Sequence, residues 1–110
     1  MANTFKNYTE RNVGTSAVPV AGYTVPGGTQ TTVIGLTLAN VTSGTVTATV
    51  VLSDGANETR VVKDAEILAG SSLVVVGGDQ KLVLEAGDSV RVSSDTATAL
   101  DVIMSVLEID

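Results

Sequence analysis

The sequence predicts an all-β domain, a two-sheet antiparallel β-sandwich of about eight short strands. Three observations predict it. Apolar and polar residues alternate with a period of two, turn-forming Gly, Pro, Asn and Asp separate the runs, and no run has the period of a helix. The apolar residues are mainly Val, interleaved with Thr, and branching at Cβ suits a pleated surface. Immunoglobulin-like and jelly-roll topologies both fit this pattern.

The first half of the chain divides into a polar arm and four strands. A length of 110 residues allows one hydrophobic core, so we expect an extended amino-terminal arm over residues 1–14 and one sandwich domain over residues 15–110. Alternation predicts that Ile34, Leu36 and Leu38 share one face, and that Val46, Ala48, Val50 and Leu52 point inward. Asp54 and Gly55 suit a hairpin turn. The strands are expected at residues 17–25, 31–39, 45–52 and 58–63.

The second half predicts three short strands and one long one, at residues 72–76, 82–84, 88–93 and 99–109. Gly-containing turns separate them. The last strand is apolar on both faces, which is typical of a strand that is covered on both sides. It is therefore expected to be central in its sheet or to lie in an interface.

Charge is distributed very unevenly along the chain. The net charge is −6, yet residues 12–53 contain no Asp, Glu, Lys or Arg, and the acidic residues other than Glu10 all follow Ser53. Because the surface of a soluble monomer is normally rich in charged side chains, this uncharged stretch predicts a surface that partner subunits bury. The alternative is a Thr-rich, solvent-exposed sheet that happens to lack charges. The acidic remainder argues against nucleic-acid binding and against an anionic membrane as partner.

The composition argues against catalysis. The chain has no Cys and no His, which removes thiol chemistry, the usual zinc ligands and the most common general base. The pairs Asp64 with Glu66 and Glu85 with Asp88 are interpreted as turn or strand-edge acids, since they match no calcium loop and the chain lacks aromatic platforms for sugars. We expect no enzyme activity, no metal and no cofactor.

The candidate site is therefore an interface. Phe5 and Tyr8 are aromatic residues on a polar arm and are expected to anchor the arm in a partner's groove. The remaining candidates are the outward-facing residues of the uncharged strands and of the last strand. The predicted interface residues are Phe5, Tyr8, Val33, Thr37, Thr45, Thr47, Thr49, Ile103, Leu107 and Ile109.

Several segments resemble a known group of proteins. They are MANTFKNY at residues 1–8, TVPGGTQTTVIGLTLAN at 24–40, VVKDA at 61–65, LVLEAGDSV at 82–90 and SVLE at 105–108. These segments resemble small virion structural proteins of tailed bacteriophages, of the type found in cyanophages and other marine phages. The resemblance implies a non-catalytic, oligomeric component of the virion that is assembled in the host cytoplasm.

The sequence and the resemblance together predict a capsid decoration or cement protein. We expect a homo-oligomer, with a trimer favoured, that contacts other virion proteins such as the major capsid protein or tail and neck proteins. The alternatives are an accessory protein of the neck, tail, baseplate or fibre, and, from a different class, a carbohydrate-binding module.

Overall fold

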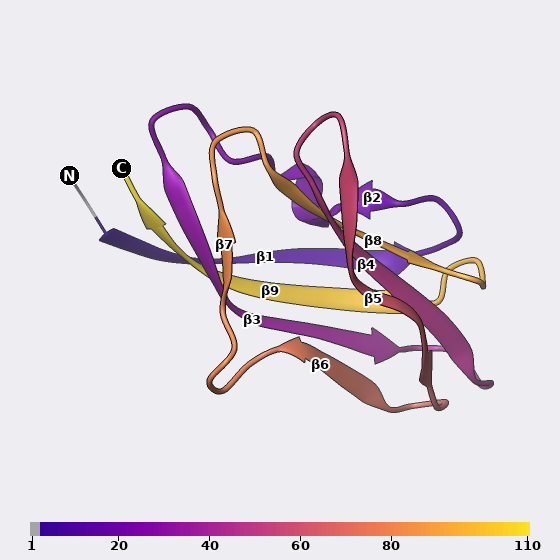
Figure 1. Ribbon diagram of the computed structural model, residues 1–110. Helices are drawn as coiled ribbons and strands as arrows, with labels where there is room; N and C mark the ends of the chain where they lie inside the picture. Colours follow the sequence, from indigo (N-terminus) through magenta and orange to yellow (C-terminus); the bar gives the residue numbers. More distant parts are fainter. Residues whose placement is uncertain (1–2) are drawn as a thin grey trace.

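The computed structural model describes residues 3–110 and shows two antiparallel β-sheets stacked face to face (Figure 1). The predicted β-sandwich is therefore confirmed. The described chain measures 45 × 28 × 21 Å along its principal axes. The elements, in chain order, are β1 (Asn3–Val13), β2 (Val18–Pro19), the 3-10 helix η1 (Val20–Gly22), β3 (Gln30–Asn40), β4 (Val46–Ser53), β5 (Glu58–Ile67), β6 (Ser72–Val76), β7 (Leu82–Leu84), β8 (Ser89–Ser94) and β9 (Leu100–Ile109).

Strands that follow one another in sequence are often in different sheets. The five-stranded sheet has the order β1-β9-β3-β6, and β7 pairs with β3 beside β6. The four-stranded sheet has the order β2-β8-β4-β5. The last strand, β9, lies between β1 and β3, so its predicted central position within a sheet is confirmed.

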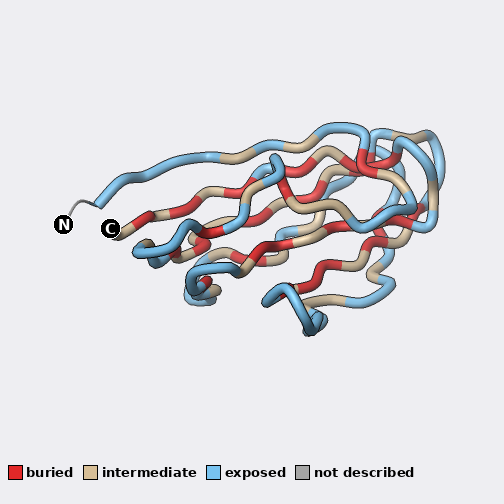
Figure 2. The backbone as a smooth tube through the Cα atoms, turned by 90° about the horizontal axis from the view of Figure 1, so that it is seen from above, coloured by how far each residue is buried: buried red, intermediate tan, exposed pale blue. Residues whose placement is uncertain are grey.

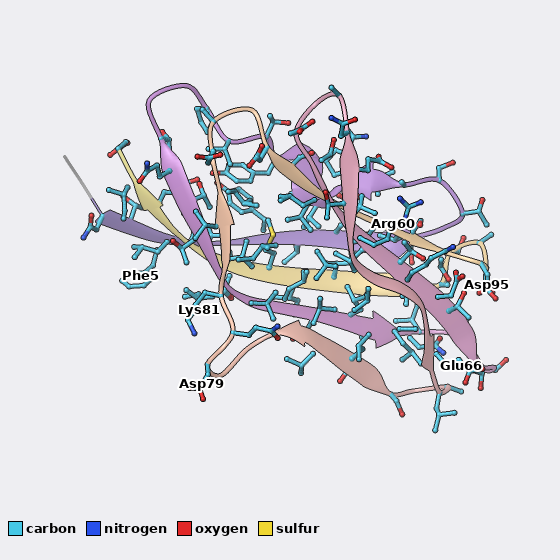
Figure 3. All side chains as sticks on the ribbon, in the orientation of Figure 1. Phe5, Arg60, Glu66, Asp79, Lys81 and Asp95 are labelled. Carbon is cyan, nitrogen blue, oxygen red and sulfur yellow. The ribbon has the colours of Figure 1, made fainter. Side chains whose placement is uncertain are left out.

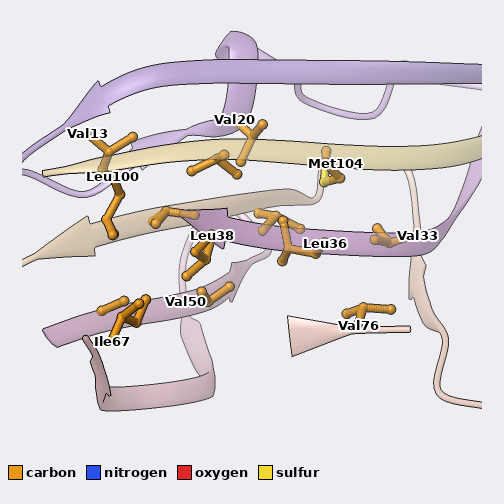
Figure 4. Close-up of a cluster of buried hydrophobic side chains, with 14 of the residues drawn as sticks. Val13, Val20, Val33, Leu36, Leu38, Val50, Ile67, Val76, Leu100 and Met104 are labelled. Atoms are coloured by element: carbon orange, nitrogen blue, oxygen red, sulfur yellow. The ribbon is translucent and has the colours of Figure 1, made fainter. Parts of the chain in front are cut away.

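The core lies between the two sheets and consists of small aliphatic side chains (Figure 4). Leu36, Leu38 and Met104 extend from the five-stranded sheet, and Val50 and Val92 meet them from the four-stranded sheet. Each of these side chains is at most 1% exposed. Burial of one such side chain contributes roughly 1.5–3 kcal/mol, so the thin core depends on many modest contributions.

Residues 17–25 do not form the predicted strand. Only Val18 and Pro19 pair with β8, and the chain then turns through η1, in which Ala21 has a φ of 55°. Pro19 has no N–H to donate to a sheet, and the turn places the side chain of Val20 in the core at 1% exposure. Burial of Val20 thus outweighs the local strand preference.

The predicted arm is extended, and it is paired. Strand β1 lies antiparallel to β9 along almost its whole length as the edge of the five-stranded sheet, with a register shift between Glu10 and Val13. Most of its residues are exposed (Figure 2). The part of the arm at residues 1–2 is outside the described residues.

A β-bulge in β3 changes which residues face the core. The register between β3 and β9 shifts between Val33 and Gly35, so Val33 and Leu36 are both completely buried, and Ile34 is displaced from the core face. The prediction that Ile34 shares the inward face of Leu36 is therefore wrong. Val33, predicted as an interface residue, is a core residue for the same reason.

Candidate assembly surface

The outer face of the five-stranded sheet carries two rows of side chains that run across its strands and combine apolar residues with threonine; we call them the apolar rows. The first row runs across four strands, and each residue is directly opposite the next. Its members are Phe5 of β1, Leu107 of β9, Thr32 of β3 and Val83 of β7. Side chains directly opposite each other on one face are about 5 Å apart at Cβ, so this row is continuous. Figure 3 shows the ring of Phe5 beside the start of β1.

The second row crosses the same strands closer to the other end of β9. Its members, each directly opposite the next, are Thr9 of β1, Ile103 of β9, Thr37 of β3 and Val74 of β6. Between the two rows lie the small residues Asn7, Ser105 and Gly35, the last of which has no side chain. The outer face therefore consists of two rows of apolar and threonine side chains, separated by a lower strip.

A shallow groove of about 260 Å³ follows part of this lower strip. A Cβ at the nearby Gly35 would lie 3.8 Å from the Cβ of Ser105, without a clash. The residues that line the groove are Phe5, Lys6, Asn7, Ile34, Ser105 and Val106.

Large apolar side chains are concentrated on this outer face. Within residues 3–110, six large hydrophobic side chains are strongly exposed, and four of them, Phe5, Val74, Val83 and Ile103, belong to the two rows. The exposed fraction is 72% for Phe5 and 54% for Ile103. Among the paired residues of this face, the ionisable side chain is Asp101 near the start of β9, and its Oδ1 accepts a hydrogen bond from the backbone N–H of Asn12.

The structure divides the predicted interface between the two sheets. Phe5, Thr37, Ile103, Leu107 and Ile109 share the outer face described above. The predicted threonines of residues 45–52 do not join them, because β4 lies in the other sheet.

The surroundings of those threonines are charged. Thr47 is opposite Glu66, and the Oγ1 of Thr49 accepts a hydrogen bond of 3.1 Å from the backbone N–H of Asp64. Thr45 precedes β4 and is exposed. The expectation of one uncharged surface over β3, β4 and β9 is therefore wrong, since alternation along each strand does not reveal in which sheet the strand pairs.

Val74 and Val83 were missed as candidates, although the sequence contains a signal for both. β6 and β7 are short runs with consecutive apolar residues, LVVV in β6 and LVL in β7. The same pattern in β9 was interpreted as a strand with two apolar faces. Applied to β6 and β7, that interpretation places one apolar residue of each strand on the outer face.

Tyr8 lies on the inner side of β1, in a polar cluster that attaches this edge strand to the sandwich. The rings of Tyr8 and Tyr23 stack with centroids 4.2 Å apart. Both hydroxyl groups donate to Oε2 of Glu108, at 2.8 Å from Tyr8 and 2.6 Å from Tyr23. The Nζ of Lys6 lies 3.1 Å from Oε1 of Glu108, and the hydroxyl groups of Tyr23 and Thr31 are 2.8 Å apart.

This cluster determines how β1 presents its side chains. Because residues alternate between the two faces of a strand, holding Tyr8 inward turns Phe5 outward, onto the assembly surface. The structure thus gives Tyr8 an intramolecular contact, and Phe5 is the aromatic residue of the arm that is free to contact a partner.

The cluster perturbs the pKa values of its members. The hydrogen bond from Tyr23, followed by those from Tyr8 and Lys6, holds the pKa of Glu108 below its ordinary value, although burial acts in the opposite direction. Burial is the main cause that raises the pKa of Tyr8, and the adjacent Glu108 carboxylate adds to it. Burial likewise raises the pKa of Tyr23.

These shifts predict a stability maximum between acid and alkaline limits. The unfolded chain takes up the Glu108 proton first, so this contribution to the free energy of unfolding is present above pH 4.5 and declines as the pH falls through the lower folded-state pKa. The unfolded chain loses the Tyr8 proton first, so that contribution is present below pH 10.0 and declines above it.

Chemical denaturation across pH checks both limits. Glu108→Gln is expected to lower the free energy of unfolding by about 1–3 kcal/mol near neutral pH and to flatten its decline on the acid side. Glu66→Gln changes an exposed glutamate of β5 and is the matched control. A wild-type acid decline that Glu108→Gln leaves unchanged would contradict the role assigned to the cluster.

Of the acidic pairs considered from the sequence, Glu85 and Asp88 lie in a turn that their own hydrogen bond closes. Oδ2 of Asp88 accepts a hydrogen bond of 2.8 Å from the backbone N–H of Glu85, which closes the turn between β7 and β8. Within residues 3–110 there is no group of three or more acidic side chains arranged to hold a metal ion. In the same range, none of the helical segments has the length and apolar character needed to cross a bilayer.

No family model matches this chain, and no curated protein matches it in sequence. Among solved structures, one similar chain is described as a pentameric capsid protein isolated from metagenomic phage sequences, with a TM-score of 0.39 and 16% identity. The match covers 94% of this chain and 58% of that chain, so this chain spans less than two thirds of the length of the solved protein.

Proposed function

We propose that this protein is a structural subunit that assembles with copies of itself through the outer face of its five-stranded sheet. One observation carries the proposal. Four of the six strongly exposed large hydrophobic side chains within residues 3–110 lie on this face, in two rows that cross the sheet. Exposed apolar patches of this kind mark interaction surfaces in soluble proteins.

The charge distribution makes this face the place where two copies can meet with the least repulsion. Each chain has a net charge of −6, so two copies repel each other over most of their surfaces. On the outer face of the five-stranded sheet, the ionisable side chain among the paired residues is Asp101, at one end. Two copies that meet through this face bury Leu107, Ile103, Val74 and Val83 without placing carboxylates opposite each other.

The size of the face suits a contact between subunits. Four strand positions at a spacing of about 4.8 Å, and a strand of ten residues at about 3.3 Å each, give roughly 600 Å² of sheet. Stable interfaces bury about 800 Å² on each partner, and side chains that project from the sheet add to the flat area. Packing of two such faces would resemble sheet-on-sheet packing inside a sandwich.

For the setting, we propose a tailed-phage virion, and within it a capsid decoration role. The support is the resemblance of residues 1–8, 24–40 and 82–90 to small virion proteins of tailed phages. In this proposal the exposed Phe5, close to the chain's start at one edge of the sheet, contacts the major capsid protein, while the rest of the apolar face joins the copies. A neck, tail, baseplate or fibre position is the alternative.

Molar mass in solution tests the assembly. Light scattering and sedimentation over a dilution series should show an oligomer that dissociates on dilution, and the mass gives the number of subunits. Higher salt should not weaken it, because the proposed contact is apolar. A monomer at every concentration would overturn the proposal. Gold labelling of the protein on intact particles then distinguishes the capsid surface from the neck and tail.

A further inference from the structure

On the opposite side of the sandwich, two arginines flank one apolar residue of the four-stranded sheet. Val51 of β4 is opposite Arg60 of β5 on one side and Arg91 of β8 on the other, and Arg91 is also opposite Pro19 of β2. At a spacing of about 4.8 Å per strand, the two arginine Cα atoms are about 10 Å apart. Figure 3 shows Arg60 on the side of β5.

The arginines cover Val51 from outside. Val90 and Val92, the neighbours of Arg91 in β8, are core residues, so alternation turns Arg91 to the outer face. Val51 is only 5% exposed, yet it does not belong to the core cluster. We attribute its burial on the outer face to the flanking arginine side chains, since the aliphatic parts of arginines pack on apolar surface.

Neither guanidinium group has a partner within residues 3–110. In this range, Lys6 has a carboxylate oxygen within 4.0 Å of its side-chain nitrogen, and neither arginine has one. The Nε of Arg91 is buried and makes no hydrogen bond. The other N–H groups of the two guanidinium groups line the pocket as unpaired donors, which favours binding of an acceptor from outside.

One acidic side chain of the hairpin, Asp54, is already engaged. Oδ1 of Asp54 accepts hydrogen bonds from the backbone N–H groups of Ala56, at 2.9 Å, and Asn57, at 2.7 Å. The hydrogen bond from Asn57, followed by that from Ala56, holds the pKa of Asp54 below its ordinary value. The Asp54 carboxylate therefore stabilises its own turn and does not neutralise the arginines.

The two arginines open into a pocket of about 480 Å³ between the β4–β5 hairpin and β8. Its lining residues are Ser53, Gly55, Ala56, Asn57, Glu58, Arg60 and Arg91. We propose that this pocket binds a carboxylate group, with Arg91 and Arg60 as the cationic donors and Asn57 as a neutral one. Guanidinium groups bind carboxylates through paired, charge-assisted hydrogen bonds.

The surroundings select one carboxylate over a polyanion. Glu58 lines the same pocket, and the chain has a net charge of −6, so a phosphodiester chain or another polyanion is repelled. A single carboxylate needs only the two arginines. The carboxylate has two possible sources, a small free molecule or an acidic side chain of a second copy, and the binding chemistry is the same.

The buried Nε–H group of Arg91 provides a direct readout by NMR. Sodium acetate is titrated into the protein against sodium chloride at equal ionic strength, at a protein concentration well below that of assembly. Acetate is expected to shift the Arg91 Nε–H resonance with saturation. A dilution series without acetate forms the second arm, in which the same shift on concentrating the protein assigns the carboxylate to a second copy.

Two variants make the test specific. Arg91→Lys keeps the aliphatic chain over Val51 and is expected to weaken acetate binding at least tenfold, followed through the Asn57 side-chain amide. Arg11→Lys changes an arginine of the β1 edge and should bind acetate as the wild type does. Equal shifts with chloride, or no saturable shift in either arm, would overturn the proposal. The pocket is on the four-stranded sheet and the assembly surface is on the five-stranded sheet, so this outcome would not contradict the proposed assembly.

Discussion

Val33→Asp is expected to leave the protein unfolded at 25 °C, although the sequence places this residue among the outward-facing positions of an uncharged strand. Val33 is completely buried between Val106 and Leu82, which are opposite it on β9 and β7. A carboxylate at this position has no partner in the aliphatic core. The expected loss in the free energy of unfolding is about 4 kcal/mol or more, which is a large part of the stability of a small domain.

Circular dichroism and urea denaturation check this result against Thr32→Asp. Thr32 is the adjacent residue of β3, it is opposite Leu107 and Val83 on the outer face, and it is half-buried. Asp at that position should cost about 1 kcal/mol, mainly through its poor β-propensity. If both variants unfolded, or neither did, the bulge that separates the two faces of β3 would be assigned incorrectly.

Ile103→Lys is expected to weaken self-association roughly a hundredfold without unfolding the chain. Ile103 is 54% exposed at the centre of the second apolar row, next to Thr9 and Thr37. In the proposed contact a lysine at this position must be buried without an acid opposite it. Changing such a central residue typically lowers the free energy of association by about 2–4 kcal/mol, and about 1.4 kcal/mol corresponds to a tenfold change in the dissociation constant.

Thr49→Lys is the matched control for this variant. It introduces the same charge on the outer face of the four-stranded sheet, beside Asp64. Sedimentation should therefore show wild-type association for Thr49→Lys and monomers for Ile103→Lys at the same concentration. The opposite result would move the contact to the other sheet, and an equal loss in both variants would indicate a general effect of charge.

Much of the fold is readable from the sequence because its signals are local. The alternation at residues 45–52 predicts the inward positions Val46, Ala48 and Val50, and all three are buried. Asp54 and Gly55 predict the turn that joins β4 to β5, and Gly55 adopts the positive φ of 97° that such turns require. The doubly apolar pattern of β9 correctly indicates a central strand.

The candidate surface is only partly readable in the same way. The outward positions of β9 follow from alternation, and Phe5 is a candidate because it is an aromatic residue on a polar arm. The polar cluster that orients Phe5 does not, because its hydrogen bond between Tyr8 and Glu108 joins residues 100 positions apart. The two arginines beside Val51 likewise come from β5 and β8, which flank β4 in the sheet and are separated along the chain by β6 and β7.

The sequence by itself determined that this chain forms strands, where most of them lie, and that an uncharged half is joined to an acidic one. Tertiary structure alone decided that β3 and β4 pair in different sheets, that a bulge turns Val33 into the core, and that Val74 and Val83 extend the apolar rows. The physical reason is that alternation reports the two faces of one strand, whereas the partner of each face is selected by contacts between distant segments.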